Sequence, residues 1–159
     1  MTLFPVLYFS AGRIGFSSKY DGKTVTGLVG SSVNFTWSFS GDVNRVNWGL
    51  KKAGGIGFEN NGVLVSLGKS GSLSVTVPSA YNGRVSGSGD TSSGQVIFTL
   101  GSIRMSDERS YGCLIDPTDS FGQQKLDFVY LAVQGEYGIV IEDTSSSGLE
   151  VGQNRRGYK

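Results

Sequence analysis

The stretch SDERSYGCLI, residues 106–115, contains the only cysteine of the chain, Cys113. Its second half has the period of a β-strand, in which Cys113 and Ile115 share one face and Leu114 takes the other. A lone cysteine cannot close a disulfide within its own chain, so the cysteine count does not reveal the redox compartment. The question is therefore which residue lies opposite Cys113 in the core.

Other stretches show the same alternation of apolar and polar side chains. In SVNFTWSF, residues 32–39, every second residue is apolar and the rest are Ser, Asn or Thr. This pattern is typical of an antiparallel strand with one buried face. The inward sets are Val33, Phe35, Trp37 and Phe39; Val46, Trp48 and Leu50; Leu73, Val75 and Val77; Val96, Phe98 and Leu100; and Val129, Leu131 and Val133. The sequence predicts an all-β domain of about nine strands arranged as a sandwich.

The composition agrees with many short strands joined by turns. Glycine supplies 25 of the 159 residues, against an average near 7%, and there are only 3 prolines. The net charge of +1 predicts no general attraction to nucleic acid or to an anionic membrane. No stretch approaches the ~20 apolar residues of a membrane-spanning helix, so an anchor is expected only outside this sequence.

The chain divides into three parts. Residues 1–12, MTLFPVLYFSAG, are interpreted as a signal remnant or an N-terminal strand. Residues 13–135 form the predicted domain. Residues 136–159 offer one short strand, residues 137–141, and then a Ser-rich stretch with a basic end, which indicates an interdomain junction or a tail.

Over residues 13–134 the chain resembles the variable-type (V-set) domains of the immunoglobulin superfamily. The residues that carry the resemblance are SVNFTW, VNWGL with Trp48 as the core tryptophan, NGRV, QVIFTL and SDERSYGC, in that order. The resemblance implies a Greek-key sandwich of two antiparallel sheets. It also implies that Arg84 pairs with Asp107, and that the hydroxyl of Tyr111 bonds back to the backbone as a tyrosine corner.

The chain departs from the family at the cysteine pair. The family's partner of Cys113 falls 11 residues before Trp48, and Trp37 stands there, so the intersheet disulfide is absent. Trp37 is expected to replace part of it by packing its indole against Trp48 and Cys113, provided that its N–H finds an acceptor. Cys113 is then expected to be a buried, inert thiol. An intermolecular disulfide and a reactive thiol are the alternatives.

The sequence predicts that the protein is not an enzyme and uses no cofactor or metal. It contains no histidine, which removes Ser-His-Asp, Cys-His and His-based metal sites. The adjacent carboxylates Asp107 with Glu108, and Glu142 with Asp143, point apart on a strand. The glycine clusters are not followed by a helix that could bind phosphate.

The resemblance directs attention to one sheet face as the binding surface. Because side chains alternate between the two faces of a strand, Phe128 and Tyr130 are expected to point outward, as is Leu114 beside them. Asn47 and Lys51 face the same way. Such an apolar patch with a polar rim is typical of a protein interface. The alternative is that Phe128 and Tyr130 are covered by the N-terminal segment or by the loop of residues 116–124.

The end loops are a second candidate surface. Glycan binding there would use aromatic and polar side chains, and the candidates are Asp42, Asn44, Asp116, Asp119 and Phe121. These residue types are also ordinary turn formers.

The resemblance implies an extracellular recognition domain that binds another protein, a copy of itself or a related domain on an apposed cell. Among immunoglobulin domains, the chain is similar in style to the allorecognition proteins of colonial cnidarians. We therefore expect the ectodomain of a type I membrane protein, a homodimer, and a glycan at Asn34 of the sequon Asn34-Phe35-Thr36. The alternatives are an immune or lectin-like module that binds a non-self ligand through its loops, and an adhesive module without a specific partner.

Overall fold

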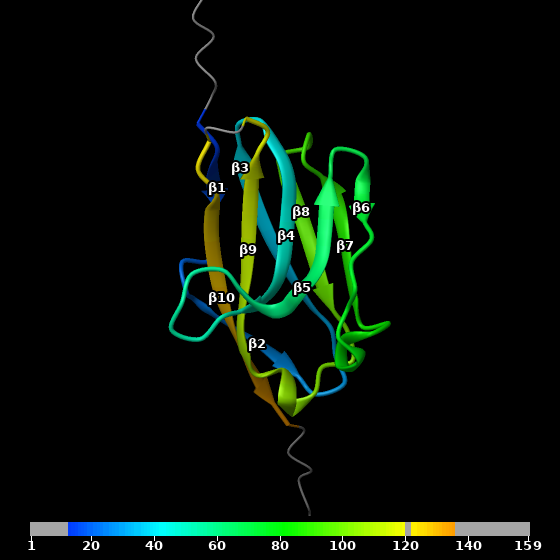
Figure 1. The fold of residues 1–159 in the computed structure, drawn as a ribbon. Coiled ribbons are helices and arrows are strands. Elements are labelled where there is room, and N and C mark those ends of the chain that lie inside the picture. The colour runs from blue at the N-terminus through cyan, green and yellow to red at the C-terminus, as the bar shows by residue number, and fades with distance from the viewer. Residues whose placement is uncertain (1–12, 120–121, 136–159) are drawn as a thin grey trace, which may run out of the picture.

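The computed structural model of the chain describes residues 13–119 and 122–135, which form an all-β sandwich of two sheets (Figure 1). The strands are β1 (Gly15–Ser18), β2 (Thr24–Leu28), β3 (Val33–Ser40), β4 (Val43–Lys51), β5 (Phe58–Gly68), β6 (Gly71–Leu73), β7 (Val85–Asp90), β8 (Gln95–Leu100), β9 (Arg109–Pro117) and β10 (Lys125–Gln134). Two short 3₁₀ turns, η1 (Ser79–Tyr81) and η2 (Met105–Asp107), lie between strands.

The two sheets differ in their number of strands, with four in one and six in the other. One sheet has the order β1-β3-β8-β7 and the other has the order β2-β10-β9-β4-β5-β6. The strand pairs are antiparallel except β2 with β10, which run parallel from Thr24 opposite Tyr130 to Leu28 opposite Gln134. The N-terminal part of the domain therefore changes sheets between β1 and β2.

The core lies between the sheets and contains most of the side chains that the alternation predicts. Trp48 of β4 stacks on Phe98 of β8 with ring centroids 5.5 Å apart, and on Tyr111 of β9 at 5.3 Å. Because Phe98 and Trp48 belong to different sheets, the contact between their rings packs one sheet against the other. The predicted inward sets of β3, β4, β8 and β10 are confirmed as buried, with Val33 of β3 half-buried.

The prediction for residues 72–77 is correct only in part. Only Gly71–Leu73 forms a strand, and Leu73 is exposed. Strand β6 is the edge of its sheet and pairs with β5 at only three positions, after which the chain leaves toward η1 and the other sheet. The predicted inward position is therefore wrong for Leu73, whereas Val75 and Val77 are half-buried after the strand ends and Val77 packs against the core.

The predicted ion pair and tyrosine corner are both present. Arg84 pairs with Asp107, and their side chains are 7% and 3% exposed. The Arg84 guanidinium also donates to the carbonyl groups of Ala80, Gly101 and Ser102. The Tyr111 hydroxyl donates to the carbonyl oxygen of Asp107 at 3.0 Å. These contacts fix the turn before β9, and with it the place of Cys113.

Tyr111→Phe is expected to lower the free energy of unfolding by about 1 kcal/mol, because the buried Asp107 carbonyl loses its hydroxyl donor while the ring stays in place. Urea denaturation measures this loss. Tyr130→Phe is the matched control, since Tyr130 is exposed. Equal effects from the two variants would contradict a structural role for the Tyr111 hydroxyl.

Candidate functional site

The outer face of the six-stranded sheet brings the predicted binding residues together. Strand register places Leu126 opposite Leu114, and Leu114 opposite Asn47. In the next row, Phe128 lies opposite Gly112 and Gly112 lies opposite Gly49. Tyr130 follows opposite Ser110, so the residues chosen by strand period do share one face.

The exposed part of this face is aromatic. The side chains of Phe128 and Tyr130 are 37% and 36% exposed, and both belong to β10. Leu114 and Leu126 are half-buried beside them. We call Leu114, Leu126, Phe128 and Tyr130 the outer patch.

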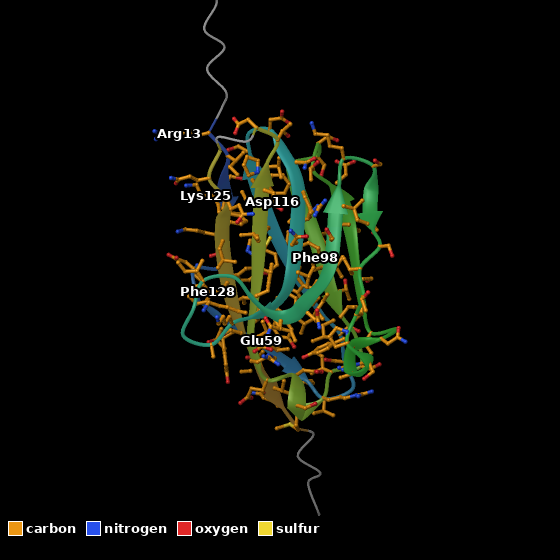
Figure 2. The ribbon with its side chains drawn as sticks, viewed as in Figure 1. Arg13, Glu59, Phe98, Asp116, Lys125 and Phe128 are labelled. Atoms are coloured by element: carbon orange, nitrogen blue, oxygen red, sulfur yellow. The ribbon has the colours of Figure 1, made fainter. Side chains whose placement is uncertain are left out.

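Lys51 is engaged within the domain. Its Nζ lies 4.9 Å from the centroid of the Phe128 ring, a distance at which a cation is attracted to the ring face. The same ammonium donates to the carbonyl oxygens of Lys52 and Gly55 at 3.4 and 3.3 Å. Lys51 therefore holds the β4–β5 connection beside Phe128, which is labelled in Figure 2.

Part of this face has a cover that the sequence did not predict. The β4–β5 connection crosses in front of β9 and β10 (Figure 1), and Glu59 at the start of β5 pairs with Arg109 of β9. A Cβ on Gly49 would lie 2.0 Å from the carbonyl oxygen of Gly62, so the backbone of β5 sits directly against β4. A Cβ on Gly112 would lie 3.3 Å from the Phe58 ring.

The turn before β2 also reaches the face, whereas the N-terminal segment of residues 1–12, which one interpretation placed over Phe128 and Tyr130, lies outside the described residues. A Cβ on Gly22, which has a φ of +77°, would lie 2.8 Å from the Phe128 ring. The turn before β2 thus flanks Phe128 on one side while Lys51 lies over the ring. The outer patch remains open between these two covers.

The acceptor for the indole N–H of Trp37 is Asp127, a residue that was not predicted from the sequence. Its carboxylate, 3% exposed, accepts from the indole N–H of Trp37 at 2.7 Å and from the backbone N–H groups of Tyr20 and Asp21 at 2.6 and 2.8 Å. Trp37 belongs to one sheet and Asp127 to the other, so this hydrogen bond joins the sheets. Asp127 is also the cross-strand partner of Cys113.

The aromatic neighbours of Trp37 differ from those expected. Its ring meets Tyr20 edge to face at 5.0 Å and also pairs with Phe35 and Phe98. Tyr20 comes from the segment between β1 and β2, and its hydroxyl accepts from the backbone N–H of Thr36 at 3.1 Å. The crossing of the N-terminal segment between the sheets is therefore fixed around Trp37.

Cys113 is a free thiol with no exposed surface. Burial, with a contribution from the nearby Asp127 charge, raises its pKa well above the ordinary value. Since the thiolate is the reactive form, the thiol in the folded domain is inert and out of reach of a second copy.

The predicted loop residues are used mainly in local contacts. Asp116 accepts from the side-chain amides of Asn47 and Gln124 at 3.1 and 2.6 Å. Asp42 pairs with Lys69 at 3.1 Å, and the hydrogen bond from Lys69 lowers the pKa of Asp42. The carboxylate of Asp119 caps the backbone N–H of Gly122. Asn44 is exposed, and Phe121 lies outside the described residues.

Asn34 lies on the opposite side of the sandwich from the outer patch. It is exposed on β3, and its Oδ1 accepts from the Thr99 hydroxyl at 2.8 Å. Residues 1–12 and 136–159, including the predicted strand at residues 137–141 and the pair Glu142 and Asp143, lie outside the described residues.

Comparisons with known proteins give no relative. No protein-family model matches the chain, and no curated protein is significantly similar to it. Among residues 13–119 and 122–135, no three Cys, Asp or Glu side chains gather where a metal ion could bind. In the same residues, no helix has the length and apolar character needed to cross a bilayer.

Proposed function

We propose that the chain is a variable-type immunoglobulin domain of a cell-surface recognition protein, which binds a second copy of itself through the outer patch. The observation that carries the proposal is the pair of exposed aromatic side chains, Phe128 and Tyr130, on one strand of an otherwise well-covered sheet. Aromatic side chains of this kind tend to dominate the energetics of protein interfaces.

The strand order supports the variable-type assignment. Such domains have one sheet of four strands and a second sheet extended by two further strands beyond the constant-type arrangement. The order β1-β3-β8-β7 and the five strands β10-β9-β4-β5-β6 have this form, and β2 is a sixth strand that pairs parallel with β10. The Arg84–Asp107 ion pair, the Tyr111 corner and the buried Trp48 stand at the positions that the resemblance implies.

The charge of the chain favours self-association over an oppositely charged partner. Its net charge of +1 causes little repulsion between two copies, and it steers no strongly charged molecule toward the domain. An apolar patch is complementary to its own copy related by two-fold symmetry. The loop surface has less to offer a ligand, because Asp42 and Asp116 already have partners within the domain.

A glycan at Asn34 fits this arrangement. Asn34 projects from the four-stranded sheet, so a glycan there would leave the outer patch free for protein contacts. In this proposal the protein is extracellular, and recognition between apposed cells is the biological role. The domain performs no catalysis and holds no cofactor.

Phe128→Asp with Tyr130→Asp is expected to abolish self-association of the full chain, because charges would replace the two exposed rings of the outer patch. Sedimentation velocity over a concentration series measures the association. Met105→Asp is the control, since Met105 is also an exposed apolar residue but belongs to η2 and not to the strands of the outer patch.

The double variant must keep the circular dichroism spectrum of the wild type. A wild type that stays monomeric at high concentration would contradict the homophilic proposal. Equal association of the wild type and the double variant would place the contact elsewhere on the domain.

A further inference from the structure

A hollow of about 330 Å³ lies beside the outer patch, over β4, β5 and β6. Its lining includes Arg45, Asn47, Val63, Ser66, Leu73 and Val75. This volume falls at the lower end of the range for ligand sites in proteins. The hollow shares no residue with the outer patch, so an inference drawn from it does not depend on the homophilic contact.

The only charged side chain in the lining is Arg45. Arg45 is exposed and makes no ion pair with the described residues. Asp116 lies directly opposite Arg45 on β9, yet its carboxylate is occupied by the amides of Asn47 and Gln124. The hollow therefore presents a guanidinium without a carboxylate partner.

The polar floor of the hollow is already ordered. The buried Ser66 hydroxyl donates to Asn47 Oδ1 at 2.7 Å, and Asn47 Nδ2 donates to Asp116 at 3.1 Å. An amide nitrogen carries two hydrogens, so Asn47 retains one N–H for a ligand. A ligand acceptor near Arg45 would thus meet fixed donors rather than side chains that must first be ordered.

The walls of the hollow are aliphatic. Val63, Val75 and the exposed Leu73 supply them, and the lining contains no aromatic ring on which a sugar face could stack. A guanidinium with aliphatic walls fits a short peptide in which a carboxylate side chain has aliphatic neighbours. Bidentate pairing with Arg45 would fix the orientation of that carboxylate.

We propose that this hollow binds the segment Leu149-Glu150-Val151 of the chain itself, with the Glu150 carboxylate on Arg45. The segment lies in residues 136–159, outside the described residues, and Glu150 is the acidic residue there with an aliphatic residue on each side. An extended chain covers about 3.3 Å per residue, so the residues after β10 are long enough to reach across the sheet within one copy or to a second copy.

The test uses the full chain carrying Glu150→Gln, so that its own segment does not compete, and adds a synthetic peptide of residues 147–154, SGLEVGQN. Backbone amide signals in NMR spectra report binding. We expect saturable shifts at Asn47, Ser66 and Ser74, which line the hollow. Adding Arg45→Gln to the chain is expected to weaken binding about ten-fold, as is placing Glu150→Gln in the peptide.

Lys52→Gln, added to the same chain, is the control, because Lys52 is an exposed cation outside the hollow. Unchanged peptide binding by this variant together with the loss at Arg45 supports the site. The proposal is overturned if the peptide does not bind, if the two peptides bind equally, or if the shifted signals lie outside β4, β5 and β6. None of these results depends on whether the outer patch mediates self-association.

Discussion

Asp127→Ala is expected to lower the free energy of unfolding by about 3 kcal/mol, because the fully buried Trp37 indole N–H loses its acceptor, at about 1–3 kcal/mol, and two part-buried backbone N–H groups lose theirs as well. The carboxylate of Asp127 accepts from three donors: the Trp37 indole and the backbone N–H groups of Tyr20 and Asp21. Removing this carboxylate breaks the hydrogen bond between the two sheets. It also breaks the two hydrogen bonds that hold the segment between β1 and β2. Chemical denaturation of the wild type and the variant measures the loss.

Asp116→Ala is the matched control for this prediction. Asp116 also accepts from side-chain donors, but it is half-buried at the end of β9. We expect Asp127→Ala to cost several times more than Asp116→Ala. A double-mutant cycle with Trp37→Phe isolates the indole hydrogen bond. If the effects of Asp127→Ala and Trp37→Phe simply add, the two side chains are not coupled, and the intersheet role of Asp127 is wrong.

Strand period predicted most of the core because one face of each long strand is buried and the other is not. Phe35 and Trp37 of β3, and Val129 and Leu131 of β10, have no exposed surface, as the alternation requires. The same rule gave the outward positions of Phe128 and Tyr130. The pattern failed at Leu73, which is exposed on the short edge strand β6, while Val77 beyond that strand does pack against the core.

Asp127 could have been found from the sequence. It alternates with Val129 and Leu131, so the period that assigned those two inward also assigned Asp127 inward. A carboxylate at an inward position requires donors. The unexplained indole N–H of Trp37 was the donor that lacked an acceptor.

The cover formed by the β4–β5 connection could not be predicted from strand period. It depends on two glycines, Gly49 and Gly112, that are adjacent only in the folded sheet. Their missing Cβ atoms let the backbone of Gly62 and the ring of Phe58 approach the sheet. Glycine is frequent throughout the chain, so composition gave no reason to single out these two. The hollow at Arg45 was also missed, because its lining is assembled only when β4, β5 and the segment from Leu73 to Val75 lie side by side in the folded sheet.

Trp37→Cys is expected to restore an intersheet disulfide with Cys113 if the domain is variable-type, because residue 37 then occupies the position of the family's missing cysteine. The reduced variant loses the buried indole, which costs about 3–5 kcal/mol. Oxidation is expected to recover roughly 4 kcal/mol for a closed loop of about 75 residues. The oxidised and reduced forms of one variant should therefore differ widely in the denaturant concentration at which they unfold.

Thiol alkylation followed by mass spectrometry shows whether the bond forms. Phe35→Cys is the control, because Phe35 is also fully buried on β3 but lies one inward position away, and its thiol should stay reduced. A disulfide that forms in Trp37→Cys but not in Phe35→Cys would support the variable-type assignment, because that assignment requires residue 37 of β3 to face Cys113 of β9. If Trp37→Cys folds but keeps two free thiols under oxidising conditions, the strands do not meet as that family requires, and the proposed recognition function loses its structural basis.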